Sequence, residues 1–516
     1  MIKSLIDKIL RKAPAKPRAS SGKSGAKPRI PTGKRVEVPQ SEHGIDANLV
    51  DDRAIKVVKT LQDAGYEAYI VGGAVRDLLL GLRPKDFDVA TNATPEQVKG
   101  LFRRAFIIGR RFRIVHVVYG RGREHEVIEV STFRAYLDAT EAEQVAGNEK
   151  TSKKELADKS HVVDASGRVL RDNVWGPQDQ DAARRDFTIN AMYYDPSTGV
   201  VVDYHGGIKD AKKRLLRMIG VPDVRYREDP VRIIRVVRFA AKLGFEIEPK
   251  TREPLQAMAQ LLSNVPQSRL FDEMIKLLQT GHARASLDEL RKQGLDRGIF
   301  PVLDAVFDSS RQQHADRARF IDLALADTDR RVGEDKPVAP SFLLACLLWH
   351  DVLAQWKRNL AQGEHNFPAL QQATDAVFDA RIGDISGRGK LAADMREIWT
   401  MQPRFERRIG SGPLSLVEQP RFRAGFDFLR LRAQVGEVDA ELADWWESFS
   451  LGDNHERRHL MDVAREQEIA KRQSRGSQSA EGGDAGPAGD APTKKRRRRR
   501  RKPAGEGGGR SEAAGE

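Results

Sequence analysis

The chain has 516 residues, more than one compact hydrophobic core holds, so we expect two to four domains. Its single cysteine, Cys346, cannot form an internal disulfide, and no apolar run reaches the roughly 20 residues that cross a bilayer, so we expect a cytoplasmic protein without stable membrane insertion. The net charge of +14 lies mainly in residues 1–40 and in the run from Lys494 to Lys502, which excludes a uniformly basic protein that wraps nucleic acid.

The N-terminal part of the chain has the composition of a disordered segment. Residues 11–40 are rich in Pro, Gly, Ser, Lys and Arg, and we expect a disordered basic segment over residues 1–45. Order is expected from about Asn48. Apolar residues from Val50 to Leu61 then follow helical spacing, and Gly65 ends this predicted helix.

The next segment carries the first chemical signal. A short apolar strand, residues 67–71, runs into Gly72-Gly73, where the missing side chains let a phosphate approach the backbone. Residues 86–90 are a second expected strand, and period-two geometry places Asp86 and Asp88 on the same face. Paired carboxylates beside a phosphate cradle suit a hard cation, Mg²⁺ or Mn²⁺.

The remaining elements predict an α+β protein. Thr94-Pro95-Glu96-Gln97 is a helix start with a capping box, and residues 114–119 and 127–132 are expected strands. The polar stretch 136–180 is expected to be partly a mobile loop. From Asp179 onward helical patterns dominate, including a helix closed by Gly244, and we expect no structure from Gln473.

Four motifs in order give the chain a family resemblance. They are GGAVRDLLLG from Gly72, KDFDVATNATPEQV from Lys85, RRDFTINAM from Arg184 and REDPVR from Arg227. The chain resembles the class II nucleotidyltransferases, which include bacterial poly(A) polymerases and CCA-adding tRNA nucleotidyltransferases. The resemblance is strong over residues 48–280 and weak beyond. It implies a small mixed α/β head like that of DNA polymerase β, followed by an all-helical body and disordered basic tails.

The resemblance implies roles for individual residues. Asp86 and Asp88 match the metal-binding pair, and Asp186 is our first choice as the further catalytic acid, with Glu129 as the second. ATP is the implied substrate, and the positions that match nucleotide-binding residues are Gly72, Gly73 and Arg76 for the triphosphate, Arg185 and Asn190 near sugar and phosphates, Asp229 and Arg232 for the base, and Arg235 for a phosphate.

The expected organisation is a catalytic head with helical modules and two tails. We assign residues 1–45 to a disordered segment, 46–205 to the nucleotidyltransferase head, 206–280 to a base-reading neck, 281–472 to an RNA-binding body and 473–516 to a disordered Arg-rich tail. The tail is expected to hold RNA through its phosphates. The implied partners are RNA 3′ ends, ATP and the RNA-decay machinery.

The expected reaction is template-independent addition of AMP from ATP to RNA 3′ ends, which promotes RNA turnover. CCA addition to tRNA is the alternative, since both activities share the same catalytic parts, and a catalytically dead RNA-binding scaffold is a remote one. His350-Asp351 lacks the further ligands of a phosphohydrolase metal site, and we interpret it as a helix-end pair. Trp445-Trp446 is interpreted as core.

Overall fold

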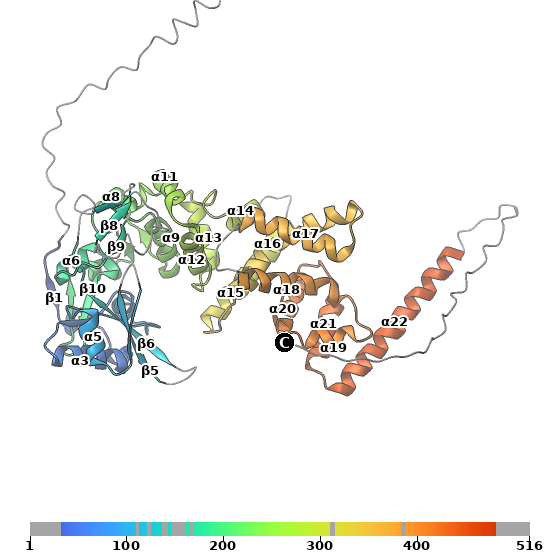
Figure 1. The fold of residues 1–516 in the computed structure, drawn as a ribbon, viewed down its shortest axis with the longest axis horizontal. Coiled ribbons are helices and arrows are strands. Elements are labelled where there is room, and N and C mark those ends of the chain that lie inside the picture. The colour runs from blue at the N-terminus through green and yellow to red at the C-terminus, as the bar shows by residue number, and fades with distance from the viewer. Residues whose placement is uncertain are drawn as a thin grey trace, which may run out of the picture.

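In the computed structural model, the head, the neck and the helical body follow one another along the long axis of the molecule (Figure 1). The structure describes residues 32–109, 113–120, 125–136, 143–145, 161–164, 169–309, 315–382 and 389–480. The predicted disorder of residues 1–31, the run from Lys494 to Lys502 and most of the expected loop 136–180 therefore lie outside the described residues. No helix within those ranges is long and apolar enough to be a candidate membrane span.

An eight-stranded sheet forms the centre of the head, in the order β1-β11-β10-β2-β3-β6-β5-β4. Neighbouring strands are antiparallel except β3 and β6, which are parallel. Buried apolar side chains of the sheet pack with those of three helices, α3 (Asp52–Asp63), α4 (Gly73–Leu79) and α5 (Pro95–Leu101). The strands are β1 Val36–Val38, β2 Ala68–Val71, β3 Asp88–Thr91, β4 Ala105–Ile108, β5 Ile114–Tyr119, β6 Glu126–Thr132, β10 Met192–Asp195 and β11 Val200–Asp203.

Local sequence signals correctly predicted several elements of the head. The helix predicted from residue 50 onward is α3, and the strands predicted at 67–71, 114–119 and 127–132 are β2, β5 and β6. The capping box at Thr94 is present, because its hydroxyl accepts from Gln97 N while the Gln97 side chain accepts from Thr94 N. The helix start succeeds because its capping contacts lie within one turn of the chain, and the strands succeed because their apolar patterns match the buried face of the sheet.

Other predictions for the head were wrong in detail. Order begins before Asn48, since β1 pairs with β11 along the sheet edge and a short helix, α2 (Gln40–His43), follows. Strands β10 and β11 interrupt the region where helices were expected. Asp86 precedes β3 rather than belonging to it, so only Asp88 lies in the strand. Within the expected loop there are also three short strands, β7 Glu143–Val145, β8 His161–Asp164 and β9 Val169–Asp172.

Beyond the sheet the structure is helical, and the neck and body share one hydrophobic core. A continuous cluster of buried residues extends from Phe187 to Leu431. Gly244, with φ 64°, caps α9 at the predicted position. The helices of these regions are α6 Gln178–Arg184, α7 Gly207–Lys212, α8 Pro222–Glu228, α9 Val231–Leu243, α10 Pro249–Arg252, α11 Leu255–Met258, α12 Gln267–Leu278, α13 Ala283–Lys292, α14 Pro301–Ser309, α15 Ala315–Gly333, α16 Pro340–Ala361, α17 Asn366–Arg381, α18 Gly389–Phe405, α19 Gly412–Val417 and α20 Phe422–Gln434.

The last two helices, α21 (Ala440–Leu451) and α22 (Asn454–Ala480), complete the body. Trp446 is buried in a separate aromatic cluster, as predicted. The expected loss of structure from Gln473 was wrong for its first residues, because α22 continues to Ala480 despite the glycine and serines of that stretch. His350 was also misplaced: it lies inside α16, not at a helix end, and its Nε2 is 2.6 Å from Glu437 Oε1.

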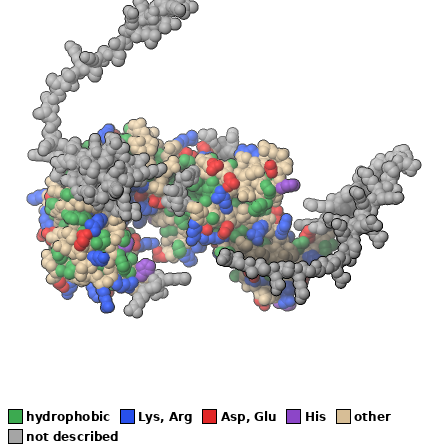
Figure 2. All heavy atoms as spheres, in the orientation of Figure 1, with side chains coloured by type: hydrophobic (Ala, Val, Ile, Leu, Met, Phe, Trp, Pro, Cys, Tyr) green, Lys and Arg blue, Asp and Glu red, His purple; other side chains and the backbone are tan. Residues whose placement is uncertain are grey.

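The charged side chains are intermixed over the visible face of the molecule. Figure 2 shows Lys and Arg side chains interspersed with acidic and apolar ones over both head and body, rather than gathered into one basic field. This distribution agrees with the near-neutral charge of the chain between the two basic ends. Polyanion binding by the described part of the molecule must therefore depend on local arrangements of charge.

Candidate active site

The two glycines of the predicted phosphate cradle lie at the end of β2. Gly72 has φ 75° and ψ −129°, a backbone conformation that residues with a side chain rarely adopt, and α4 begins at Gly73. A Cβ at Gly72 would lie 3.4 Å from Arg185 Nη1, and a Cβ at Gly73 would lie 3.5 Å from Arg76 Nη2. Both distances are ordinary van der Waals contacts, so it is the positive φ of Gly72 that requires glycine, and the two guanidinium groups beside the glycine backbone suit a triphosphate.

The predicted metal-binding carboxylates lie next to this cradle. Asp88 begins β3, and its Cα is paired with Val71 of β2 on one side and with Glu129 of β6 on the other. Desolvation, together with the negative charges of Glu129 and Asp86, raises the pKa of Asp88 to about 6, against the opposing effect of Arg185. Asp88 also keeps an exposed surface, so solvent screens part of the repulsion from these like charges.

These carboxylates fit a hard divalent cation in chemical type. Their oxygens are the donors that Mg²⁺ and Mn²⁺ prefer, and the raised pKa of Asp88 indicates negative charge that the protein does not compensate. Over the described ranges, however, no three Asp, Glu, His or Cys side chains form a group that could hold a metal ion unaided. The site therefore offers a partial ligand set, and oxygens of a bound nucleotide are suited to complete it.

Asp186 occupies a different environment from Asp88. Its Oδ2 accepts hydrogen bonds from Arg235 Nε (2.9 Å) and Nη2 (2.6 Å), and its Oδ1 accepts from Asn190 Nδ2 (3.2 Å). Burial opposes its ionisation, but the Arg235 guanidinium outweighs burial and lowers the pKa of Asp186 to about 2. Asp186 is thus a paired carboxylate that joins the head to α9 of the neck, and Arg235 uses its Nε and Nη2 for this pair. The expectation that Arg235 also holds a phosphate remains a prediction.

Asn190 connects Asp186 to the phosphate cradle. While its Nδ2 donates to Asp186, its Oδ1 accepts from Arg76 Nη1 at 2.9 Å, and Arg76 also pairs with Asp77. Arg76 is buried, as befits a guanidinium with two fixed partners. A continuous line of polar contacts therefore runs from the glycine cradle through Asn190 to the neck at Arg235.

Arg185 is fixed by a partner that the sequence analysis did not single out. Its Nη2 lies 3.2 Å from the buried Asp181, one helical turn away, and Asp181 also accepts a hydrogen bond from the Tyr193 hydroxyl at 2.8 Å. Arg185 Nη1 additionally donates to the Asn190 carbonyl. The i,i+4 spacing of Asp181 and Arg185 was the available signal for this contact.

The predicted base-reading residues are held by two different partners. Asp229 Oδ2 accepts from Arg269 Nη2 of α12 at 2.8 Å, and Arg232 Nη1 donates to Glu228 Oε2 at 3.0 Å and to the Arg225 carbonyl at 2.9 Å. Arg269 carried no local signal in the sequence, because it is distant from Asp229 along the chain. Asp229 and Arg232 are therefore both held in fixed orientations. Arg235, on the helix α9 that also carries Arg232, connects this part of the neck to Asp186.

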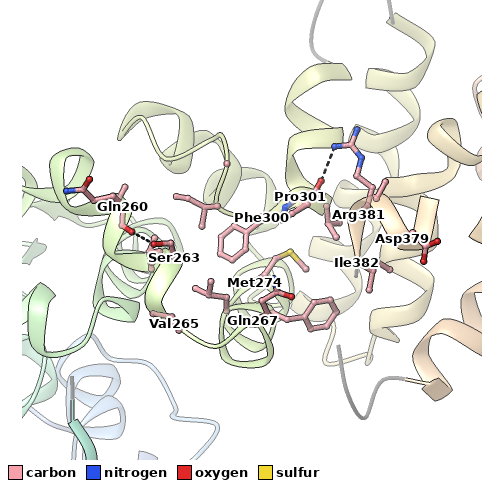
Figure 3. A pocket seen from close by; sticks show the side chains of 18 residues that line it. Gln260, Ser263, Val265, Gln267, Met274, Phe300, Pro301, Asp379, Arg381 and Ile382 are labelled. Atoms are coloured by element: carbon pink, nitrogen blue, oxygen red, sulfur yellow. Dashed lines mark hydrogen bonds between the residues drawn. The ribbon is translucent and has the colours of Figure 1, made fainter. Parts of the chain in front are cut away.

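A cavity of about 520 Å³ lies away from these residues, where the neck meets the body. Figure 3 shows Phe300 and Met274 near its centre, with Arg381 donating to the Pro301 carbonyl at its edge. None of its lining residues is a predicted site residue. Asp379 is the only acid among its lining residues, so the cavity offers no paired carboxylates for the chemistry that the sequence predicts.

Comparison with known proteins covers most of the chain. Family models match for the poly A polymerase head domain over residues 68–217, the probable RNA and SrmB-binding site of polymerase A over 244–307 and the polymerase A arginine-rich C-terminus over 362–503. Poly(A) polymerase I of Salmonella typhimurium is 40% identical over 432 residues, 82% of this chain and 88% of that protein. For the Haemophilus influenzae enzyme of the same name the values are 42% over 412 residues, 79% and 86%. The CCA-adding enzyme of Bacillus subtilis is 35% identical over 238 residues, 46% of this chain and 53% of that protein.

Proposed function

The chain belongs to the bacterial poly(A) polymerase family, and we propose that it lengthens RNA 3′ ends with AMP taken from ATP, releasing pyrophosphate. The activity is that of a template-independent polynucleotide adenylyltransferase. The observation that carries this conclusion is the extent of the similarity: poly(A) polymerase I sequences match across head, neck and body, whereas the CCA-adding enzyme matches less than half of the chain.

Nucleotide incorporation tests this function directly. The purified protein is incubated with Mg²⁺ and each NTP separately, using an unstructured RNA oligomer and a tRNA that lacks its CCA end. Long products from ATP alone on the unstructured RNA are the expected result. Addition limited to C, C and A on the tRNA would instead assign the chain to the CCA-adding enzymes.

We propose that ATP binds with its triphosphate in the head and its base at the neck. The triphosphate lies at Gly72 and Gly73 and is held by Arg76 and Arg185, whose guanidinium groups are fixed by Asn190 and by Asp181. Such pre-oriented donors lose little side-chain entropy when they bind phosphate oxygens. The adenine base is then read by hydrogen bonds at the neck, from the pair that Arg269 and Glu228 hold in place.

We propose that Asp86 and Asp88 hold Mg²⁺. A bound Mg²⁺ supplies Lewis-acid stabilisation to the attacking 3′ oxygen and to the transferring phosphoryl group. The chain's own residues position the reaction around that point. Asp88 supplies a carboxylate whose charge is uncompensated in the protein alone, and Arg185 offers a cation on the phosphate side of the same strand end.

The further catalytic acid is proposed from two candidates that differ in geometry. Asp186 remains the first candidate, and its contacts support a role in positioning, because it fixes Arg76 through Asn190 and fixes the neck through Arg235. Glu129 lies opposite Asp88 and supports a role in cation affinity. Glu129→Gln should therefore raise the Mg²⁺ concentration needed for half-maximal activity. Asp186→Asn should lower kcat at saturating Mg²⁺ without that change.

Substitution of Asp86 separates an enzyme from a scaffold. Asp86→Asn should abolish AMP transfer and leave RNA binding largely intact, whereas a scaffold that acts through RNA binding alone would function normally with this change. We propose that the tails made by the enzyme promote RNA turnover through the RNA-decay machinery, and that proposal is tested by RNA half-lives in cells that carry Asp86→Asn in place of the native enzyme.

A further inference from the structure

A second polar site lies in the body, in a groove between α15, α20 and the beginning of α16. The groove encloses about 340 Å³, and none of its residues takes part in the candidate active site. Its three helices meet near the middle of the body in Figure 1. Four arginines contribute to its wall, and we call it the arginine groove: Arg330 and Arg331 of α15, and Arg423 and Arg430 of α20.

The charges in the arginine groove do not cancel. Asp327 pairs with Arg330 and Asp427 pairs with Arg423, each within one turn of the same helix. Arg331, by contrast, donates only to the Pro337 carbonyl among its recorded hydrogen bonds, and Arg430, on the exposed side of α20, has neither a hydrogen bond nor an ion pair within the described residues. Two positive charges therefore remain without a carboxylate partner on opposite walls of one groove, which favours an anionic occupant.

The groove also offers apolar surface beside these cations. Phe342, partly buried at the start of α16, and Leu323 of α15 line it together with the arginines. Sites for single-stranded nucleic acid combine cations that follow the phosphates with aromatic rings that contact bases. An acidic peptide would use the cations alone, whereas RNA uses both the cations and an aromatic ring in the same groove, so the composition favours RNA.

The position of α15 connects the arginine groove to the active site. Arg330 and Arg331 lie in its last turn, and the loop that follows brings Asp335 to the head, where its Oδ1 is 2.5 Å from Lys85 Nζ. Lys85 directly precedes Asp86. Asp335 adopts φ 56°, an uncommon conformation for a residue with a side chain, at this point of contact. The end of α15 therefore approaches the head at the carboxylates where an RNA 3′ end must arrive.

We propose that the arginine groove binds the sugar-phosphate backbone of single-stranded RNA upstream of the reacting 3′ end. Arg331 and Arg430 contact phosphates from the two walls, and Phe342 contacts a base. The inference rests on the proposed function only in placing a 3′ end at Asp86. It adds a subsite that a primer reaches only when it is long enough to extend from the head into the body.

The test compares the full-length protein with the double variant Arg331→Ala/Arg430→Ala. A matched control, Lys357→Ala/Arg358→Ala, removes the same charge from exposed positions of α16 outside the groove. Affinity for fluorescent single-stranded RNAs of increasing length is measured at salt concentrations from 50 to 200 mM. Circular dichroism melts of all three proteins check that the variants are folded.

The expected result is a loss of affinity by the groove variant that is confined to the longer RNAs. Removing two phosphate contacts lowers the slope of log affinity against log salt by about 1.4, so the fall in affinity between 50 and 200 mM salt becomes about sevenfold smaller. AMP addition to the shortest primer should be unchanged. The control should follow the wild type throughout.

Three outcomes would overturn the proposal. They are a groove variant with wild-type affinity and salt slope on long RNA, equal losses by groove and control variants, and equal losses on short and long RNA. If the wild type does not add AMP to RNA, the proposed function is refuted. The binding measurements would still decide whether the arginine groove binds RNA. Crosslinking of 4-thiouridine RNA adds a second measurement, in which crosslinks should map to residues 323–342 and 423–434.

Discussion

Replacing Asp88 by asparagine should stabilise the protein while it abolishes activity. The side chain has its pKa raised from 3.8 to about 6 by desolvation and by the charges of Glu129 and Asp86. Ionisation at neutral pH therefore costs folding free energy, about 3 kcal/mol at 1.36 kcal/mol per pKa unit. Because Asp88 keeps an exposed surface, solvent screens part of this cost, and we expect a gain of about 1 kcal/mol for Asp88→Asn.

The pH dependence of this gain follows from the sign of the pKa change. A carboxyl group whose pKa is higher in the folded than in the unfolded state favours folding below its unfolded pKa and loses that contribution as pH rises. The advantage of Asp88→Asn should therefore be small at pH 4, grow between pH 4 and 6, and be complete above pH 6. Bound Mg²⁺ offsets the same repulsion, so it should stabilise the wild type more than the variant.

Calorimetric melts without divalent ions measure this effect. A change of 1 kcal/mol corresponds to about 2–4 °C in the Tm of a domain as large as the head. Asp63→Asn, which removes an exposed carboxylate at the end of α3, controls for net charge. A variant less stable than the wild type at pH 7.5, or equally stabilised at pH 4, would refute the electrostatic reasoning.

Three other perturbations follow from the contacts of the neck and the tail. Arg235→Ala leaves Asp186 without its paired cation and should lower the free energy of unfolding in urea by about 2–3 kcal/mol at pH 7. Because the paired Asp186 has a pKa of about 2, below its unfolded value, this difference should shrink as the pH falls from 4 towards 2. An unchanged urea midpoint at pH 7 would contradict the pairing. Arg232→Ala should reduce the preference for ATP over CTP and GTP in single-nucleotide incorporation while RNA affinity changes little, and an unaltered preference would remove this residue from base reading. Deleting residues 493–516 removes the Arg-rich run, so RNA affinity should fall and its salt dependence should flatten, whereas equal salt slopes would mean that the run does not contact phosphates.

The sequence predicted those parts of the molecule that local geometry determines. The glycine at position 72, the capping box at Thr94 and the left-handed cap at Gly244 each express a requirement satisfied within a few residues. Residues 68–71 and 126–132 form strands where alternating or apolar patterns indicated them. The carboxylate pair and the glycine cradle could be placed in one site because only a short segment separates them.

Non-local pairing accounts for what the sequence could not determine. Strand β1 is ordered by its pairing with β11, although it belongs to a basic, proline-rich segment. The register that sets Glu129 opposite Asp88 depends on a parallel pair of strands separated by two others along the chain. In the same way, the ion pair of Asp229 with Arg269 joins residues that no local pattern relates.

Charged side chains are paired at the neck and partly unpaired at the head, and we relate this contrast to the different ligands proposed for the two regions. At the neck, Arg269 pairs with Asp229 and Glu228 pairs with Arg232, so the donors and acceptors of the two proposed base-reading residues are held in one arrangement. At the head, Asp88 faces the like charges of Glu129 and Asp86, which Arg185 compensates only in part. Selection among bases requires rigid partners, because a mobile pair would adapt to several bases. Binding of a metal and a triphosphate instead requires charge left uncompensated by the fold, so we expect stability to be lowest at Asp88, where we propose that the reaction takes place.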